Sequence, residues 1–285
     1  MEASSRACWS LKCSDFGFQP DISPSINVPQ CGINVVLYFI YRCIVFLYFN
    51  TYMIFDLVTT INGFDGVRTF IFLTTWVYLL FNLYVLVSFM NTLIDAYLFF
   101  KRRGDLVEGT PTRLKFQWFL FNIILNGSVV ITFTFWILYY TTPTIQIFFT
   151  NMVRNINLHL LPAIFALIDL LTTSTPIRFV HVIYPIFLGL AYLTFAAIYW
   201  KAGGTNPWGL PFIYPSLDFG DDPREAIIFS VELIAATILC QAVVKGLYLL
   251  REWLTHSNNP SYTALDGTNS AGGRPTGSAM ELPNR

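Results

Sequence analysis

Charged residues are scarce in this chain. They make up 12% of its 285 residues, whereas soluble globular proteins carry about 25%. The formal net charge is zero, with 17 basic and 17 acidic side chains, so the sequence lacks the basic surface that a nucleic acid needs. This composition argues against a soluble enzyme, a disordered scaffold and a nucleic-acid-binding protein.

Several chemical motifs are also missing. The sequence has no Walker loop, no dinucleotide-type glycine fingerprint, no HExxH and no GxSxG. Its cysteines show no spacing of a metal site, and they are Cys8, Cys13, Cys31, Cys43 and Cys240. We therefore expect neither a metal nor a cofactor.

Apolar residues are what the sequence has in abundance. They make up 54% of the chain, and the mean hydropathy is +0.54. A membrane-crossing helix needs about 20 apolar residues. Six segments meet this requirement: residues 33–55, 69–100, 116–140, 155–173, 177–200 and 226–250. The sequence predicts an all-α polytopic membrane bundle of six transmembrane helices.

The distribution of Lys and Arg predicts the orientation. Twelve lie in the termini, the loop after the second span and the turn after the fourth, against four on the other side. By the positive-inside rule, both termini face the cytosol. Residues 1–32 and the disordered tail 253–285 are then cytosolic, while the loop 201–224 faces outward as a structured cap. We expect a plasma membrane or endomembrane location. The tail segment Tyr262–Leu265 has the form of an endocytic sorting signal or is plain flexible tail.

Two charged residues lie inside predicted spans. At about 1.5 Å per helical residue, Arg42 and Asp169 lie roughly 12 Å and 9 Å above the inner boundary. A charge in a bilayer needs a partner or a function. We interpret the two as a structural ion pair, the alternative being a site for a lipid headgroup or carboxylate.

A second polar layer is predicted nearer the outer face. Thr74, Thr75, His159 and Glu232 come to roughly 6 to 10 Å below the outer boundary, from spans two, four and six. A hydroxyl becomes a good nucleophile when a base such as imidazole takes its proton. The structural alternative is that each threonine bonds its own helix and the histidine only packs.

The stretch 159–219 resembles the rolling stone family. The resemblance rests on the apolar run from His159 to Asp169, on TPIRFVHVIYP, and on IYWKAGGT followed by PFIYPSLDF. It covers about residues 8–252, with departures at Pro162 and Phe219. The resemblance implies a multipass membrane protein at the cell surface, since the founding member is tied to myoblast fusion.

The sequence is also distantly similar to the androgen-induced and androgen-dependent membrane hydrolases, which are thought to cleave fatty acid esters of hydroxy fatty acids. Their nucleophile lies in a Leu-Thr pair that matches Leu73-Thr74, and their histidine stands ten residues before an acidic residue, as His159 does here. The similarity implies Thr74 as nucleophile and His159 as base. Thr75 remains an alternative nucleophile, and Glu232 is a supporting candidate from depth alone.

Two hypotheses follow. The first is an intramembrane lipid-ester hydrolase whose substrate enters from the membrane lipids of the outer leaflet. The second is a non-enzymatic surface protein in adhesion or cell fusion, which contacts a partner protein through the loop 201–224.

Overall fold

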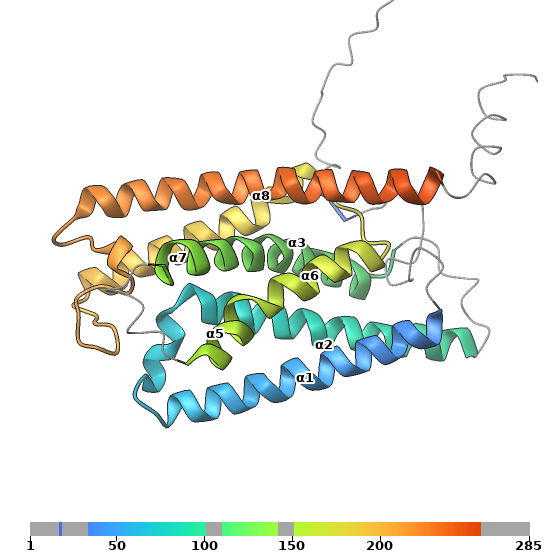
Figure 1. Cartoon of the computed structure of the whole chain (residues 1–285), viewed down its shortest axis with the longest axis horizontal. Helices are drawn as coiled ribbons and strands as arrows, with labels where there is room; N and C mark the ends of the chain where they lie inside the picture. Colours follow the sequence, from blue (N-terminus) through green and yellow to red (C-terminus); the bar gives the residue numbers. More distant parts are fainter. Residues whose placement is uncertain (1–16, 19–33, 101–109, 142–150, 258–285) are drawn as a thin grey trace, which may run out of the picture. The chain divides into compact units, whose positions relative to one another are not determined.

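The computed structural model describes residues 17–18, 34–100, 110–141 and 151–257. The chain forms one compact unit of residues 1–248 and a second of residues 249–285. In the described ranges every long element is a helix, and none is a strand (Figure 1). Cys8, Cys13, Cys31 and the sorting-signal candidate Tyr262–Leu265 lie outside the described residues.

The described residues contain six spans that are long and apolar enough to cross a membrane, which confirms the predicted bundle. The helices are α1 (Val35–Ile61), α2 (Leu73–Phe100), α3 (Thr112–Phe133) with the π-helical η4 (Thr134–Tyr139), α5 (Met152–His159), α6 (Leu161–Thr172), α7 (Ile183–Lys201) and α8 (Pro223–Ser257). Short 3₁₀ helices are η2 (Gly66–Ile71), η5 (Phe179–Val182) and η6 (Pro215–Leu217).

The observed boundaries differ from the predicted ones where a cap sets the start of a helix or a helix outlasts its apolar run, as in α1, which runs over Val35–Ile61 and not over 33–55. The Asn34 side chain accepts a hydrogen bond from the Val36 N–H at 2.8 Å and begins α1. At the other end of the chain, α8 continues to Ser257, so residues 253–257 are helical rather than part of the tail. The rest of that tail, 258–285, lies outside the described residues.

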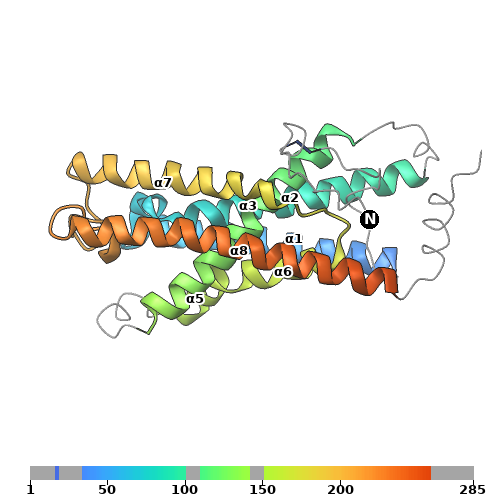
Figure 2. The same ribbon diagram turned by 90° about the horizontal axis from the view of Figure 1, so that it is seen from above.

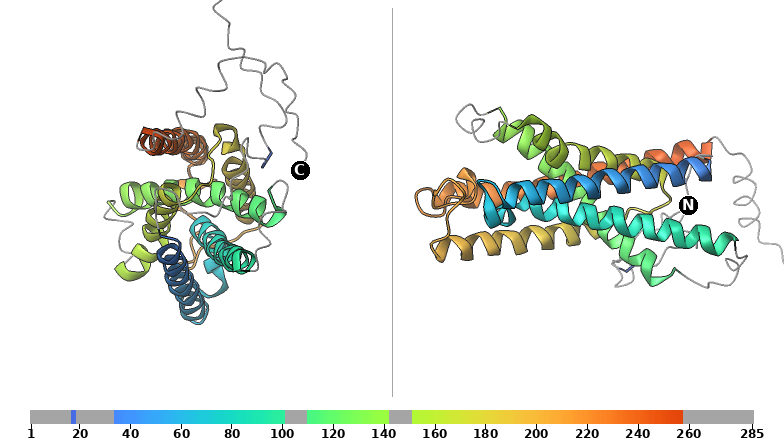
Figure 3. Two further views of the ribbon diagram at one scale, coloured as in Figure 1. Left: turned by 90° about the vertical axis from the view of Figure 1, so that its right-hand side faces the viewer. Right: turned by 90° about the horizontal axis from the view of Figure 1, so that it is seen from below.

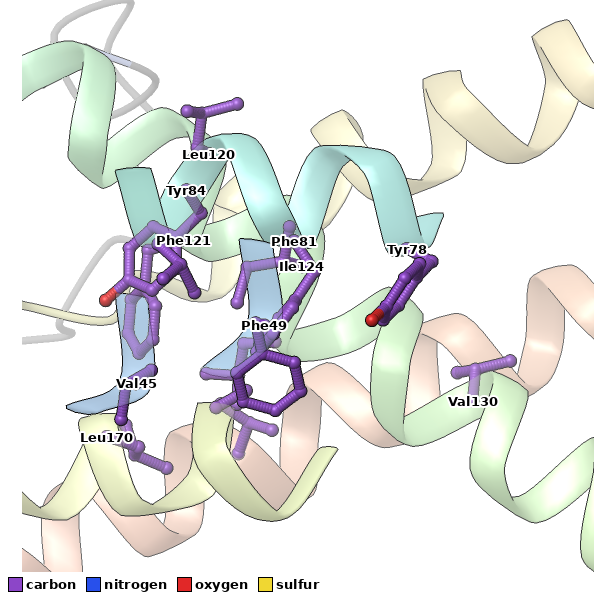
Figure 4. Packing of buried hydrophobic residues seen from close by; sticks show 14 of the residues in the cluster. Val45, Phe49, Tyr78, Phe81, Tyr84, Leu120, Phe121, Ile124, Val130 and Leu170 are labelled. Atoms are coloured by element: carbon purple, nitrogen blue, oxygen red, sulfur yellow. The ribbon is translucent and has the colours of Figure 1, made fainter. Parts of the chain in front are cut away.

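Helix α3 lies in the middle of the first unit. It packs against α2, α5, α6 and α7. In the most apolar stretch of the span Thr112–Tyr139, 61% of the residues are buried, against 17% in the corresponding stretch of α1. Figure 2 and the end-on view in Figure 3 show the other helices arranged around it. The main core gathers Phe49, Phe81, Tyr84 and Phe121 from α1, α2 and α3 (Figure 4). This core sets the helices against one another and so fixes the relative depth of their polar residues.

The loop between α7 and α8 folds into a structured cap. Gly203 and Gly209 have φ of 77° and 80°, which glycine adopts without strain. The Asn206 side-chain oxygen accepts two backbone N–H bonds from the loop, at 3.1 and 3.0 Å. Ile213 and Leu217 are buried in a second apolar cluster with residues of α7 and α8. The loop therefore has a fixed shape where it meets the helix ends.

Candidate functional site

A cavity of about 120 Å³ lies where the loop, the residues on either side of η2 and the adjoining helix ends meet. Its walls come from α2, α3, η4, α5, α7 and α8 as well as from the loop. Most of its surface is apolar, as is usual for a small-molecule site, with a few polar groups among the apolar ones. The apolar wall includes Phe72, Ile131, Leu158, Leu217, Phe229 and Leu233.

Thr74 and Thr75 both line this cavity, in the first turn of α2. Thr75 is buried, and its hydroxyl donates to the Thr69 carbonyl oxygen at 2.8 Å. Because that proton is already in use, Thr75 is the poorer nucleophile. Thr74 is half-buried, and its side chain is within hydrogen-bonding reach of the Tyr214 hydroxyl.

His159 reaches the same cavity from the end of α5. The predicted span 155–173 forms as Met152–Thr172, and its helix breaks at Leu160, with φ −125° and ψ −55°. Pro162 explains the break, since it has no N–H to donate to the Leu158 carbonyl and its ring crowds that carbonyl. At the same break, the His159 carbonyl accepts a hydrogen bond from the Thr132 hydroxyl at 2.6 Å.

The imidazole of His159 lies against an aromatic wall. Its ring stacks on Phe135 with centroids 3.7 Å apart and planes 3° from parallel. Its Nδ1 is buried and has no hydrogen-bond partner among the described residues. A nitrogen that is buried and unpaired is costly in a purely structural residue. Phe135 belongs to η4, and such π-helical turns occur frequently at functional sites.

Tyr214 is a cavity residue that the sequence reasoning did not single out, although it lies in the IYP part of the quoted family motif. Its hydroxyl oxygen accepts the Leu73 N–H at 3.1 Å, at the start of α2. Burial raises the pKa of the Tyr214 phenol above its usual value, so the group stays protonated at neutral pH.

Glu232 lies away from the cavity. It is exposed on α8, whereas Phe229 and Leu233 of the same helix line the cavity wall. Depth along a span places a residue at a level of the bundle but does not give the direction in which it points. The structure therefore brings Thr74, Thr75 and His159 together, and leaves Glu232 outside.

Ion pairs border the cavity at its polar edge. Arg154 donates from Nε to Asp56 at 2.8 Å, and its Nη1 lies 3.8 Å from an Asp65 oxygen. Arg154 and Asp65 both line the cavity, so one face of it is charged. Among the residues that the structure describes, no three His, Cys, Asp or Glu side chains gather as metal ligands would.

Arg42 and Asp169 form a separate buried cluster. Arg42 Nη1 donates to Asp169 at 2.7 Å, and their side chains are 2% and 5% exposed. The carboxylate also accepts the hydroxyl protons of Tyr41 and Tyr84, at 2.8 and 2.7 Å. The guanidinium reaches Tyr38 with two further hydrogen bonds. The cluster joins α1, α2 and α6, which favours the structural interpretation.

Comparison with known proteins agrees with the sequence motifs. The family model described as protein rolling stone matches residues 16–263. Protein rolling stone of Drosophila melanogaster is 25% identical over 221 residues, which is 75% of this chain and 78% of that protein. No solved structure matches the chain. Because the family match covers most of the sequence and all six membrane-length helices, the chain belongs to the rolling stone family.

Proposed function

We propose that this protein is an intramembrane lipid-ester hydrolase, with Thr74 as nucleophile and His159 as general base. One observation carries the proposal: the two residues come from different spans, and both line a single cavity. A hydroxyl and an imidazole that open into one apolar pocket are candidates for the nucleophile and the base that covalent ester hydrolysis uses.

The lining of the cavity suits a lipid. Its wall is mainly aliphatic and aromatic, as an acyl chain requires, and the hydroxyls are concentrated near the start of α2. By the orientation that the positive charges predict, this end of the bundle faces outward, so a substrate enters laterally from the outer leaflet. The loop 201–224 then covers the site and restricts bulk water.

The chemistry balances with water as the only co-reactant. The Thr74 oxygen bonds to the ester carbonyl carbon, its proton passes to the His159 imidazole, and the carbonyl π electrons move onto oxygen. As that oxyanion collapses, the C–O bond to the alcohol breaks, and the imidazolium protonates the departing alkoxide. Water attacks the acyl-threonine in the same way, which releases the acid and restores both side chains.

Labelling with a fluorophosphonate probe tests this assignment on the detergent-solubilised full chain. We expect wild type to be labelled and Thr74→Ala and His159→Gln to lose labelling without loss of folded protein. Thr194→Ala is the matched control, because Thr194 is exposed on α7 and only bonds its own helix. Retained labelling in both cavity variants, or an unlabelled folded wild type that also cleaves no ester in a lipid panel, would refute the proposal.

A second function, in adhesion or cell fusion, is favoured by the apolar surface beside the cap. Phe64 and Val67 are 71% and 74% exposed there, and the Phe64 ring lies 6.2 Å from that of Trp208. Single exposed apolar residues are ordinary, but a group of them outside the spans indicates a contact surface. Replacing Phe64 and Val67 by Ser, which leaves the cavity wall intact, should abolish cell fusion if this surface acts. Fusion that needs Thr74 instead would exclude it.

A further inference from the structure

Tyr214 holds its hydroxyl in one place beside Thr74. The phenol oxygen accepts the Leu73 N–H at 3.1 Å, which ties the cap to the first turn of α2. The ring packs on Tyr139 and Phe72, with centroids 5.7 and 5.6 Å away. A donor that is fixed before substrate binds loses little freedom during reaction, which is the condition for stabilising a transition state.

The neighbouring tyrosine hydroxyls already have hydrogen-bond partners of their own. Tyr192 donates to the Ile71 carbonyl at 3.0 Å, and Tyr139 pairs with the Ser216 hydroxyl at 2.5 Å. Tyr214 differs because its oxygen is occupied as an acceptor. The hydroxyls of Thr74 and Tyr192 both lie beside the Tyr214 phenol.

We propose that Tyr214 is a catalytic residue of this site, and that its phenolic O–H donates to the oxyanion formed when Thr74 attacks an ester. The assignment rests on the proposed hydrolase function. Because the attacking oxygen and the carbonyl oxygen of the ester share one carbon, a hydroxyl beside Thr74 can reach the carbonyl oxygen when the ester is turned toward it.

The donor keeps its proton through the step. The carbonyl π electrons move onto oxygen as the Thr74–carbon bond forms, and that oxygen accepts the Tyr214 hydrogen bond. When the C=O bond re-forms and the alcohol leaves with a proton from His159, the hydrogen bond weakens again. The burial that raises the pKa of Tyr214 keeps the phenol in its donating form throughout. The positive end of the α2 dipole adds to the same stabilisation.

The test compares two Tyr→Phe variants of the solubilised full chain. Tyr214→Phe removes the donor, whereas Tyr199→Phe is the matched control, since the Tyr199 hydroxyl donates to the Thr205 carbonyl at 2.9 Å and does not line the cavity. We expect the second-order rate of fluorophosphonate labelling to fall about 10²-fold or more in Tyr214→Phe, the usual effect of removing one oxyanion donor. Tyr199→Phe should label at the wild-type rate.

Two further readouts separate catalysis from structure. Affinity for a non-hydrolysable ether analogue of a lipid ester should be unchanged in Tyr214→Phe, because that ligand develops no oxyanion. Placing 4-aminophenylalanine at position 214, which keeps an N–H donor, should restore labelling even if Tyr214→Phe is unstable. Labelling of Tyr214→Phe at the wild-type rate while Thr74→Ala is inert overturns this inference and leaves the hydrolase proposal standing. An unlabelled folded wild type that cleaves no lipid ester overturns both.

Discussion

Replacing Asp169 by Asn should destabilise the helical bundle severely. The carboxylate accepts three hydrogen bonds, from Arg42, Tyr41 and Tyr84. An amide of the same shape presents one oxygen and two N–H donors, so at least one of these three donors loses its acceptor. The Arg42 charge stays in place without its counter-charge.

The size of the effect follows from burial. The Arg42 side chain is 2% exposed, so water cannot solvate the charge that remains. Removing one partner of such a buried pair costs about 3–5 kcal/mol. The pair of Arg113 and Asp95 is the comparison for this loss of stability, because its side chains are 26% and 31% exposed. A pair that water reaches contributes roughly 0–1 kcal/mol when it is fully exposed, so Asp95→Asn at this half-buried pair should cost clearly less than Asp169→Asn.

Equilibrium unfolding in mixed micelles, followed by tryptophan fluorescence, measures both variants. A double variant, Arg42→Met with Asp169→Asn, should recover part of the loss, because it removes the unpaired charge as well. The reasoning fails if Asp169→Asn unfolds no more easily than Asp95→Asn, or if the double variant is as unstable as the sum of its single changes.

Three other substitutions test the site and its supports. Glu232→Gln should leave fluorophosphonate labelling unchanged, because that residue is exposed on α8, and a loss of labelling would show that it acts on the site. Pro162→Ala restores a backbone N–H donor at the break, so we expect α5 and α6 to join into one helix and His159 to shift. Fluorophosphonate labelling should then fall at least tenfold, and labelling at the wild-type rate would contradict this. Gly204→Ala should lower the thermal midpoint by several degrees, because the added Cβ would lie 2.4 Å from the Tyr199 ring; an unchanged melting curve would refute the clash.

The membrane spans could be predicted because hydropathy alone decides them. Six apolar segments of sufficient length occur in the sequence, and six spans form in the described residues. Counting residues along each span also gave Thr74 and His159 similar depths, and the structure has both on one cavity wall. Depth follows from a constant rise per residue, so sequence position is enough to obtain it.

Rotation about each helix axis could not be obtained in the same way. Glu232 shares the depth of the cavity but lies on the exposed face of α8. An almost uniformly apolar helix gives no stripe from which to read its inward face. The sequence analysis found no pattern that predicts the π-helical turn η4. The position of Tyr214 beside the start of α2 depends on how the cap folds, which local sequence does not determine.

The break at Leu160 divides the fourth span into two halves that meet different surroundings. Below it, α6 is held by the Asp169 carboxylate, which lies out of reach of ions in solution. Above it, α5 is tied to Asp56 through Arg154, whose side chain is 31% exposed. Dissolved salt screens exposed charges and leaves buried ones almost untouched. Asp56 is only 10% exposed, so this pair is partly screened, and ionic strength acts more strongly on the half of the span that ends in His159 than on the half that carries Asp169.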